Sequence, residues 1–90
     1  MLIDKWTLQY YRDKDQVEVD LVITRGHQTW GVEVKSSRTV QPSDGRGLRR
    51  LAEQCGEDYQ GGVVLYAGTN TYALKGNNVF AVPLAALWDR

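Results

Sequence analysis

The sequence predicts an α/β fold built on a mixed β-sheet. Near the N-terminus, aromatic and β-branched residues form short runs separated by polar turns, which is typical of paired strands. One amphipathic helix follows, and after it comes the apolar run Val63-Val64-Leu65-Tyr66, which is typical of a strand buried on both faces. A helix between two strands indicates a right-handed parallel crossover. The expected order is therefore β-β-β-α-β followed by a closing hairpin.

Three strands are expected before the helix, over residues 5–12, 17–24 and 28–36. The polar run 13–16 joins the first two strands, and Arg25-Gly26-His27 forms a tight turn between the second and third. We therefore expect His27 to be a loop residue rather than a metal ligand.

The helix is expected to begin around Pro42, with Ser43 or Asp44 as its N-cap, and to end before Gly61-Gly62. Its apolar stripe consists of Leu48, Leu51, Ala52, Cys55 and Tyr59.

The C-terminal part is expected to form a hairpin that pairs residues 72–74 with 79–82. Pro83 then opens a short helical turn, and Trp88 covers one end of the core.

Composition limits the classes of protein that the chain can belong to. Its 90 residues correspond to one domain spanning 1–90, and its single cysteine excludes an internal disulfide and a cysteine-based zinc cluster. No apolar run approaches the ~20 residues that span a bilayer, so we expect a cytoplasmic protein without a membrane partner. Eleven basic and eleven acidic residues cancel, so attraction to nucleic acid must come from local charge.

The turn at Gly26-His27 predicts the register of the second and third strands. A two-residue loop pairs Arg25 with Gln28, and counting back places Asp20 opposite Glu33 and Glu18 opposite Lys35. The other face of this pair is entirely apolar, so we expect it to be the core: Val19, Leu21, Ile23, Trp30, Val32 and Val34.

The first strand is expected to extend both faces. If Arg12 pairs with Val17, the side chains of Trp6, Leu8 and Tyr10 join the apolar face. Tyr11 and Gln9 then lie beside Glu18 and Asp20.

Two carboxylates opposed across a strand pair repel each other unless a proton or a cation lies between them. Asp20 and Glu33 could bind a hard divalent ion, and Lys35 could stabilise or orient an attacking water. This combination predicts a site that cleaves phosphodiester bonds. The alternative is a solvated sheet face on which Glu18 pairs with Lys35.

The local concentration of basic residues comprises Lys35 and four arginines: Arg38, Arg46, Arg49 and Arg50. These arginines could contact phosphates near the acidic residues. The alternative is that they are solvated on the outer face of the helix.

Asp20, followed after twelve residues by Glu33-Val34-Lys35, resembles the D…(D/E)-x-K signature of the PD-(D/E)XK nuclease superfamily. The segments YYRDKDQVEVDLVI, WGVEVKSSRTVQPSDGRGLRRLAE, GVVLYAG and VFAVPLAALW are similar to one bacterial and archaeal family. That family is the nuclease-like C-terminal domain (domain of unknown function 4143) found behind an AAA-type ATPase domain.

The resemblance implies a restriction-endonuclease-like sheet with flanking helices, from which the first core helix is missing here. It implies that Asp20, Glu33 and the backbone carbonyl of Val34 hold Mg²⁺ or Mn²⁺, and that Lys35 is the catalytic lysine. We expect Glu18 to be an auxiliary acid and Gln9 to be an auxiliary residue beside Asp20.

The resemblance also suggests partners. The chain is expected to be the C-terminal piece of a larger ATPase, or to act with an AAA-type ATPase domain in cis or in trans. The absent helix predicts a homo-oligomer or a missing N-terminal segment. DNA is the expected substrate of an active nuclease, and a non-catalytic module that binds nucleic acid or a partner is the main alternative; a purely structural oligomerisation piece is a third.

Overall fold

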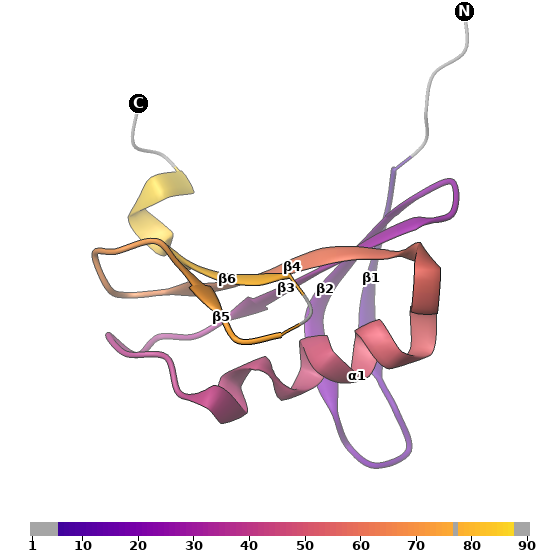
Figure 1. Cartoon of the computed structure of the whole chain (residues 1–90), viewed down its shortest axis with the longest axis horizontal. Coiled ribbons are helices and arrows are strands. Elements are labelled where there is room, and N and C mark those ends of the chain that lie inside the picture. Colours follow the sequence, from indigo (N-terminus) through magenta and orange to yellow (C-terminus); the bar gives the residue numbers. More distant parts are fainter. Residues whose placement is uncertain (1–5, 77, 88–90) are drawn as a thin grey trace, which may run out of the picture.

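The structure, a computed structural model, describes residues 6–76 and 78–87, and within these ranges it contains a six-stranded mixed sheet and one α-helix. The sheet has the order β1-β2-β3-β4-β6-β5, and α1 lies across one of its faces (Figure 1). The predicted α/β class is confirmed. The strands are β1 (Trp6–Arg12), β2 (Glu18–Arg25), β3 (Gln28–Val34), β4 (Tyr59–Tyr66), β5 (Tyr72–Leu74) and β6 (Val79–Pro83).

The connections follow the predicted order. β1, β2 and β3 are antiparallel neighbours, and α1 (Arg46–Cys55) joins β3 to β4, which run parallel. β4 and β6 are also parallel, whereas β5 and β6 form the predicted antiparallel hairpin. The 3₁₀ turn Leu84–Leu87 follows β6 as expected, and Trp88 lies outside the described residues.

The helix is shorter than predicted at both ends. The 3₁₀ turn Pro42–Gly45 precedes it, and α1 itself begins at Arg46. Gly56, with φ of 56°, ends α1 because this left-handed conformation favours glycine and does not continue a right-handed helix. Tyr59, assigned above to the helical stripe, therefore begins β4. Within residues 6–76 and 78–87, no helix is long and apolar enough to cross a membrane.

The predicted register of β2 and β3 is confirmed where the two strands are paired. Arg25 pairs with Gln28, and the ladder runs to Leu21 opposite Val32. A type II′ turn requires a positive φ at its first central residue but not at its second. Gly26 has a φ of 60°, and the φ of His27 is not positive, so the turn meets this requirement. His27 is exposed in this turn, as expected for a loop residue.

The predicted register of β1 and β2 is wrong because the turn between the strands includes Val17 and because β2 contains a bulge. Gln9 pairs with Val22, but Tyr11 pairs with Val19, so β2 has one more residue than β1 between these pairs. Arg12 pairs with Glu18 rather than with Val17, because Val17 closes the turn, where its carbonyl accepts a hydrogen bond from the amide of Asp13 at 3.0 Å. A bulge of this kind shifts the side-chain alternation along the strand, so Val19 and Val22 can both be buried in the same core.

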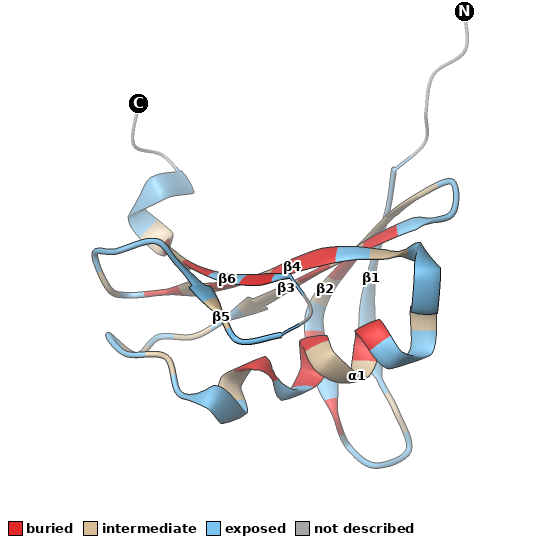
Figure 2. Ribbon diagram, viewed as in Figure 1, coloured by how far each residue is buried: buried red, intermediate tan, exposed pale blue. Residues whose placement is uncertain are grey.

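Val19 is a core residue as predicted, but otherwise the core lies on the face of the sheet opposite to the one predicted. The sheet face under α1 contributes Val19, Val22, Val64 and Val79, which pack with the helix (Figure 2). The face predicted to be the core carries no α-helix among the described residues, and side chains on it are exposed. These are Trp6, Leu8, Tyr10, Val34 and Phe80.

Two glycines explain why α1 packs on this face. A Cβ atom on Gly31 would lie 2.5 Å from one methyl carbon of Leu48, and a Cβ atom on Gly62 would lie 3.1 Å from the same side chain. Leu48 therefore occupies the space that a larger residue would fill, and its side chain is completely buried. Because Gly31 lies between Val22 and Gly62 in neighbouring strands, this face allows the helix to approach closely.

Candidate functional site

Asp20 and Glu33 come together where the ladder between β2 and β3 ends. Beyond the Leu21–Val32 pair, two side chains take over the hydrogen bonding between the strands. Glu33 Oε1 accepts a hydrogen bond from the amide of Asp20 at 2.9 Å, and Asp20 Oδ2 accepts one from the amide of Val34 at 2.8 Å. The expected juxtaposition of the two acids is present, although each is tied to the partner strand's backbone.

The bulge in β2 positions Asp20. Asp20 and Leu21 together lie opposite Tyr10, and the extra residue removes Asp20 from regular pairing with β1. In an extended strand the N–H and C=O of one residue point to the same side. Since the amide of Val34 points toward Asp20, the carbonyl of Val34 does so too. This combination of two carboxylates and a carbonyl fits the oxygen ligands preferred by Mg²⁺ and Mn²⁺.

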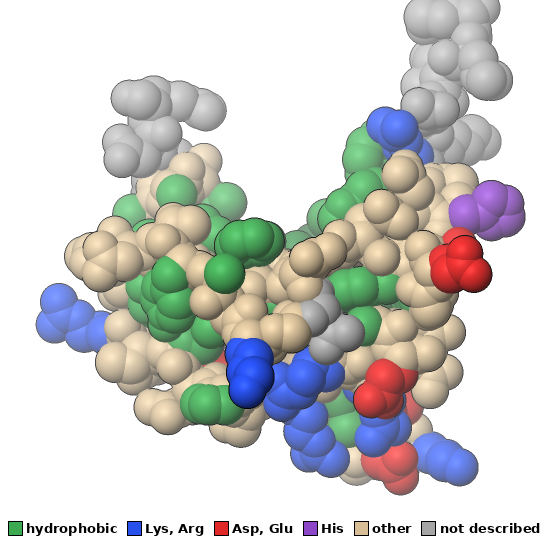
Figure 3. All heavy atoms as spheres, in the orientation of Figure 1, with side chains coloured by type: hydrophobic (Ala, Val, Ile, Leu, Met, Phe, Trp, Pro, Cys, Tyr) green, Lys and Arg blue, Asp and Glu red, His purple; other side chains and the backbone are tan. Residues whose placement is uncertain are grey.

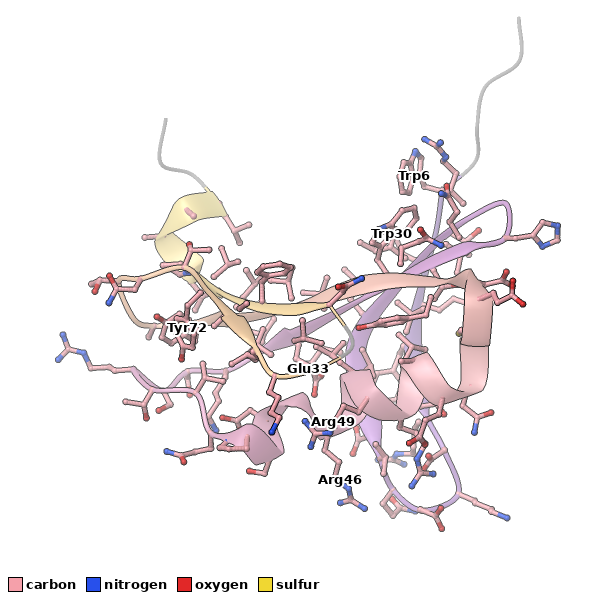
Figure 4. The ribbon with its side chains drawn as sticks, viewed as in Figure 1. Trp6, Trp30, Glu33, Arg46, Arg49 and Tyr72 are labelled. Atoms are coloured by element: carbon pink, nitrogen blue, oxygen red, sulfur yellow. The ribbon has the colours of Figure 1, made fainter. Side chains whose placement is uncertain are left out.

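Glu33 lies on the sheet face under the N-terminal turn of α1, as Figure 4 shows. A Cβ atom on Gly47 would lie 3.2 Å from Glu33 Oε2 and 2.2 Å from the carbonyl oxygen of Glu18, so glycine is needed there for α1 to approach. Burial, together with the neighbouring charges of Asp20 and Glu18, raises the pKa of Glu33 to about 7. A carboxyl group in this state is poised to exchange its proton for a cation.

Lys35 reaches the same region but is held by an acid that the sequence analysis treated only as a possible helix cap. Its Nζ lies 3.0 Å from Asp44 Oδ1, and the Asp44 side chain is largely buried. Asp44 Oδ2 also accepts a hydrogen bond from the amide of Gln41 at 2.6 Å, which anchors the turn before α1. The predicted pair between Glu18 and Lys35 is therefore replaced by Lys35–Asp44. The sequence contains no signal for this contact, because Lys35 and Asp44 lie nine positions apart in the segment between β3 and α1.

Of the two residues assigned auxiliary roles, Glu18 lines the same cleft as Glu33 and Lys35, whereas Gln9 does not. Glu18 accepts a hydrogen bond from the hydroxyl of Tyr10 and forms an ion pair with Arg12 at 3.5 Å. Gln9 is exposed on the edge strand β1, where it pairs with Val22 rather than lying beside Asp20. Among the described residues, the side chains of Glu18 and Gln9 form no hydrogen bond with Asp20 or Glu33.

The basic residues separate into two groups. Arg50 is bound to the β1–β2 turn, since its Nη1 lies 2.6 Å from Asp13 Oδ2 and 3.1 Å from Asp15 Oδ2. Arg46 and Arg49 instead lie near the N-terminus of α1 (Figure 4), and Arg38 is exposed in the loop after β3. Neither Arg38, Arg46 nor Arg49 forms an ion pair with the residues that the structure describes.

Glu33, Lys35 and the start of α1 line a cleft of about 260 Å³. Its lining includes Glu33, Lys35, Asp44, Arg46 and Gly47. Among residues 6–76 and 78–87, no group of three or more histidine, cysteine, aspartate or glutamate side chains gathers as a metal site. The carboxylates that line this cleft are those of Glu18, Glu33 and Asp44, and Asp20 adjoins it through its hydrogen bonds with Glu33 and Val34.

Residues 3–87 match the model of a protein family described as "Domain of unknown function (DUF4143)". The chain belongs to this family. No curated protein and no solved structure matched the chain. The site of this DUF4143 domain is therefore interpreted from its own geometry.

The raised pKa of Glu33 predicts that the DUF4143 domain loses stability as the pH rises. Glu33 ionises near 4.5 when unfolded and near 7 when folded, so the folded state binds the proton more tightly between these values. The contribution of the protonated Glu33 to the free energy of unfolding is fully present below pH 4.5 and is lost as the pH rises through 7. Because Glu33 is only half-buried and solvent screens its charge, we expect a loss of about 1–2 kcal/mol.

Urea unfolding at pH 4.5 to 8, in chelator, measures this dependence. Glu33→Gln should weaken the dependence of the free energy of unfolding on pH. Glu57→Gln, at an exposed acid after α1, should retain this dependence. Equal slopes in the two variants would contradict the assignment to Glu33.

Proposed function

We propose that this domain is a PD-(D/E)XK-type, metal-dependent nuclease that hydrolyses DNA phosphodiester bonds. The observation that carries the proposal is the reciprocal bonding of Asp20 and Glu33 at the bulged end of β2, with Lys35 in the cleft beside them. The strand order and the single crossover helix support a restriction-endonuclease-like fold.

The chain's own residues would hold one divalent ion, Mg²⁺ or Mn²⁺. Asp20 and Glu33 provide carboxylate oxygens, and Val34 provides its carbonyl oxygen. Such an ion supplies positive charge that offsets the charge developing on phosphorus. Loss of the Glu33 proton, whose pKa is raised to about 7, would accompany binding.

Lys35 would position or activate the attacking water. Its ammonium lies 3.0 Å from Asp44, which holds it at the cleft. Because Asp44 also fixes the turn before α1, it acts as a positioning residue for Lys35.

A path for the DNA backbone runs from this cleft along α1. Arg46 lines the acidic cleft, and Arg49 and Lys75 line a neighbouring cleft of about 380 Å³. Basic side chains gather in this part of the surface (Figure 3). These cations, with Arg38, would contact phosphates, whereas Arg50 is already neutralised by Asp13 and Asp15.

The test is a metal titration combined with a cleavage assay. Mg²⁺ or Mn²⁺ should shift the amide resonances of Asp20, Glu33 and Val34 first, because these residues surround the ligand oxygens. The purified chain should then cut single-stranded or duplex DNA faster than RNA, and only with metal. Absence of both the shifts and the cleavage would refute the nuclease proposal.

The ion pairs also favour a second candidate, a non-catalytic module that binds nucleic acid or a partner and serves an AAA-type ATPase domain in cis or in trans. Asp44 neutralises Lys35, and each carboxylate of the acidic pair accepts a hydrogen bond from a backbone amide. Such a module would bind DNA or a partner without metal-dependent cleavage. DNA binding that is lost in Arg46→Gln and Arg49→Gln variants, with no cleavage in the wild type, would support this candidate.

A further inference from the structure

The face of the sheet opposite α1 carries no α-helix among residues 6–76 and 78–87, and its apolar surface extends across five strands. Leu8 pairs with Ile23 and Ile23 with Trp30, while Val32 pairs with Val63 and Val63 with Phe80. Directly paired residues share a sheet face, so these side chains form one continuous surface opposite α1. We call it the open face. It consists of Trp6, Leu8, Tyr10, Leu21, Ile23, Trp30, Val32, Val34, Val63 and Phe80.

The open face is large enough for a specific interface. Trp6 is 54% exposed, Leu8 63%, Tyr10 57%, Val34 54% and Phe80 45%. These five side chains alone expose on the order of 500 Å². The half-buried members of the open face add to this area, which brings it toward the ~800 Å² per partner of a standard interface.

The shape of the open face is self-complementary. Trp6 and Trp30 are in contact, with ring centroids 5.5 Å apart and ring planes tilted by 37°, and form a ridge at one side (Figure 4). Beside this ridge lies a groove of about 710 Å³, bounded on its other side by Phe80 and floored by Val32 and Val63. The hollow between the two apolar walls is visible in Figure 3. A two-fold arrangement can place the ridge of each copy in the groove of the other.

The charges around the open face favour a second copy over nucleic acid or an anionic lipid surface. Arg12 and Glu18 are paired with each other at one end, and Arg25 lies 5.0 Å from the ring of Trp6 at the other. The surface between them is apolar, so it offers no row of cations to phosphates. Two identical surfaces of this kind meet without unpaired charge at their centre.

We propose that two copies of this chain associate through their open faces, with the Trp6–Trp30 ridge of each copy seated in the groove of the other. The two sheets then pack face to face about 10 Å apart, as in a β-sandwich. Each α1 and each Asp20–Glu33 site stays on the outer side of the dimer.

The test compares two double variants on the same edge strand. Leu8→Lys/Tyr10→Lys places two charges on the open face, and Thr7→Lys/Gln9→Lys places the same charges on exposed positions of the opposite face. Sedimentation velocity from micromolar to millimolar concentration measures the mass, and far-UV circular dichroism checks the fold of each variant.

We expect the wild type and Thr7→Lys/Gln9→Lys to double in mass with concentration, and Leu8→Lys/Tyr10→Lys to stay monomeric while folded. A wild type that remains monomeric at millimolar concentration would overturn the proposal and assign the open face to a different partner. So would a series of ever larger oligomers, or equal association of the two double variants. If Leu8→Lys/Tyr10→Lys does not fold, Phe80→Lys provides the same test on the other wall of the groove.

Discussion

Replacing Asp20 with asparagine is expected to abolish divalent-ion binding and metal-dependent cleavage while leaving the domain folded. Asparagine retains an oxygen that can accept the hydrogen bond from the amide of Val34, but it lacks the negative charge that a metal ion requires. It also removes the charge that repels Glu33, so the free energy of unfolding should stay the same or rise. Calorimetric titration with Mn²⁺ and urea unfolding measure the two effects.

The matched control is Asp58→Asn, at an exposed acid in the turn after α1. It should retain the Mn²⁺ affinity of the wild type. An unchanged affinity in folded Asp20→Asn would show that Asp20 is not a ligand.

Lys35→Ala should separate metal binding from the chemical step. Mn²⁺ affinity should persist, whereas the cleavage rate should fall about 100-fold, as when one transition-state stabiliser is removed. Asp44→Asn should lower the rate less, because the ammonium of Lys35 remains present but is less firmly held. An equal loss of cleavage rate in both variants would indicate that Lys35 acts only through the turn that Asp44 anchors. Lys14→Ala, in the β1–β2 turn, is the control and should cleave at the rate of the wild type.

The largest effect on stability is expected from Leu48→Ala. Leu48 is completely buried between α1 and the sheet, where it contacts the positions of Gly31 and Gly62. Truncating it leaves a cavity at the centre of the core, which should lower the free energy of unfolding by about 3–5 kcal/mol. Urea unfolding measures this loss, and Leu87→Ala, at an exposed residue, should change stability by less than about 0.5 kcal/mol.

Gly31→Ala tests why α1 packs on its observed face. Its new methyl group would lie 2.5 Å from Leu48 and 2.8 Å from Leu51, so we expect a loss of about 1–3 kcal/mol in the wild type. In the Leu48→Ala background the clash with Leu48 disappears, and the double variant should be more stable than the sum of the two single losses predicts. Strict additivity would contradict the close contact between Gly31 and Leu48.

The sequence determined the features that depend on neighbouring residues along the chain. The Gly26-His27 turn and the alternation of residues 18–25 and 28–34 predicted the register that brings Asp20 to Glu33, because a two-residue hairpin loop leaves little freedom in pairing. The crossover helix and the closing hairpin were predicted for the same local reasons.

Tertiary packing decided which face became the core. Hydrophobicity alone favoured the surface of Trp30 and Val32, but the helix packs where Gly31 and Gly62 leave room for Leu48. Glycine contributes almost nothing to a hydrophobicity pattern, although the missing Cβ atom allows the closest approach between a helix and a sheet.

Tertiary packing also decided the details of the site. The bulge in β2, which frees Asp20 from regular pairing, depends on how Val19 and Val22 both reach the core, and that requires the position of α1. The pairing of Lys35 with Asp44 likewise depends on where the turn before α1 packs. Residues nine positions apart in a loop meet only after the helix has docked, so sequence spacing contains no signal for their contact.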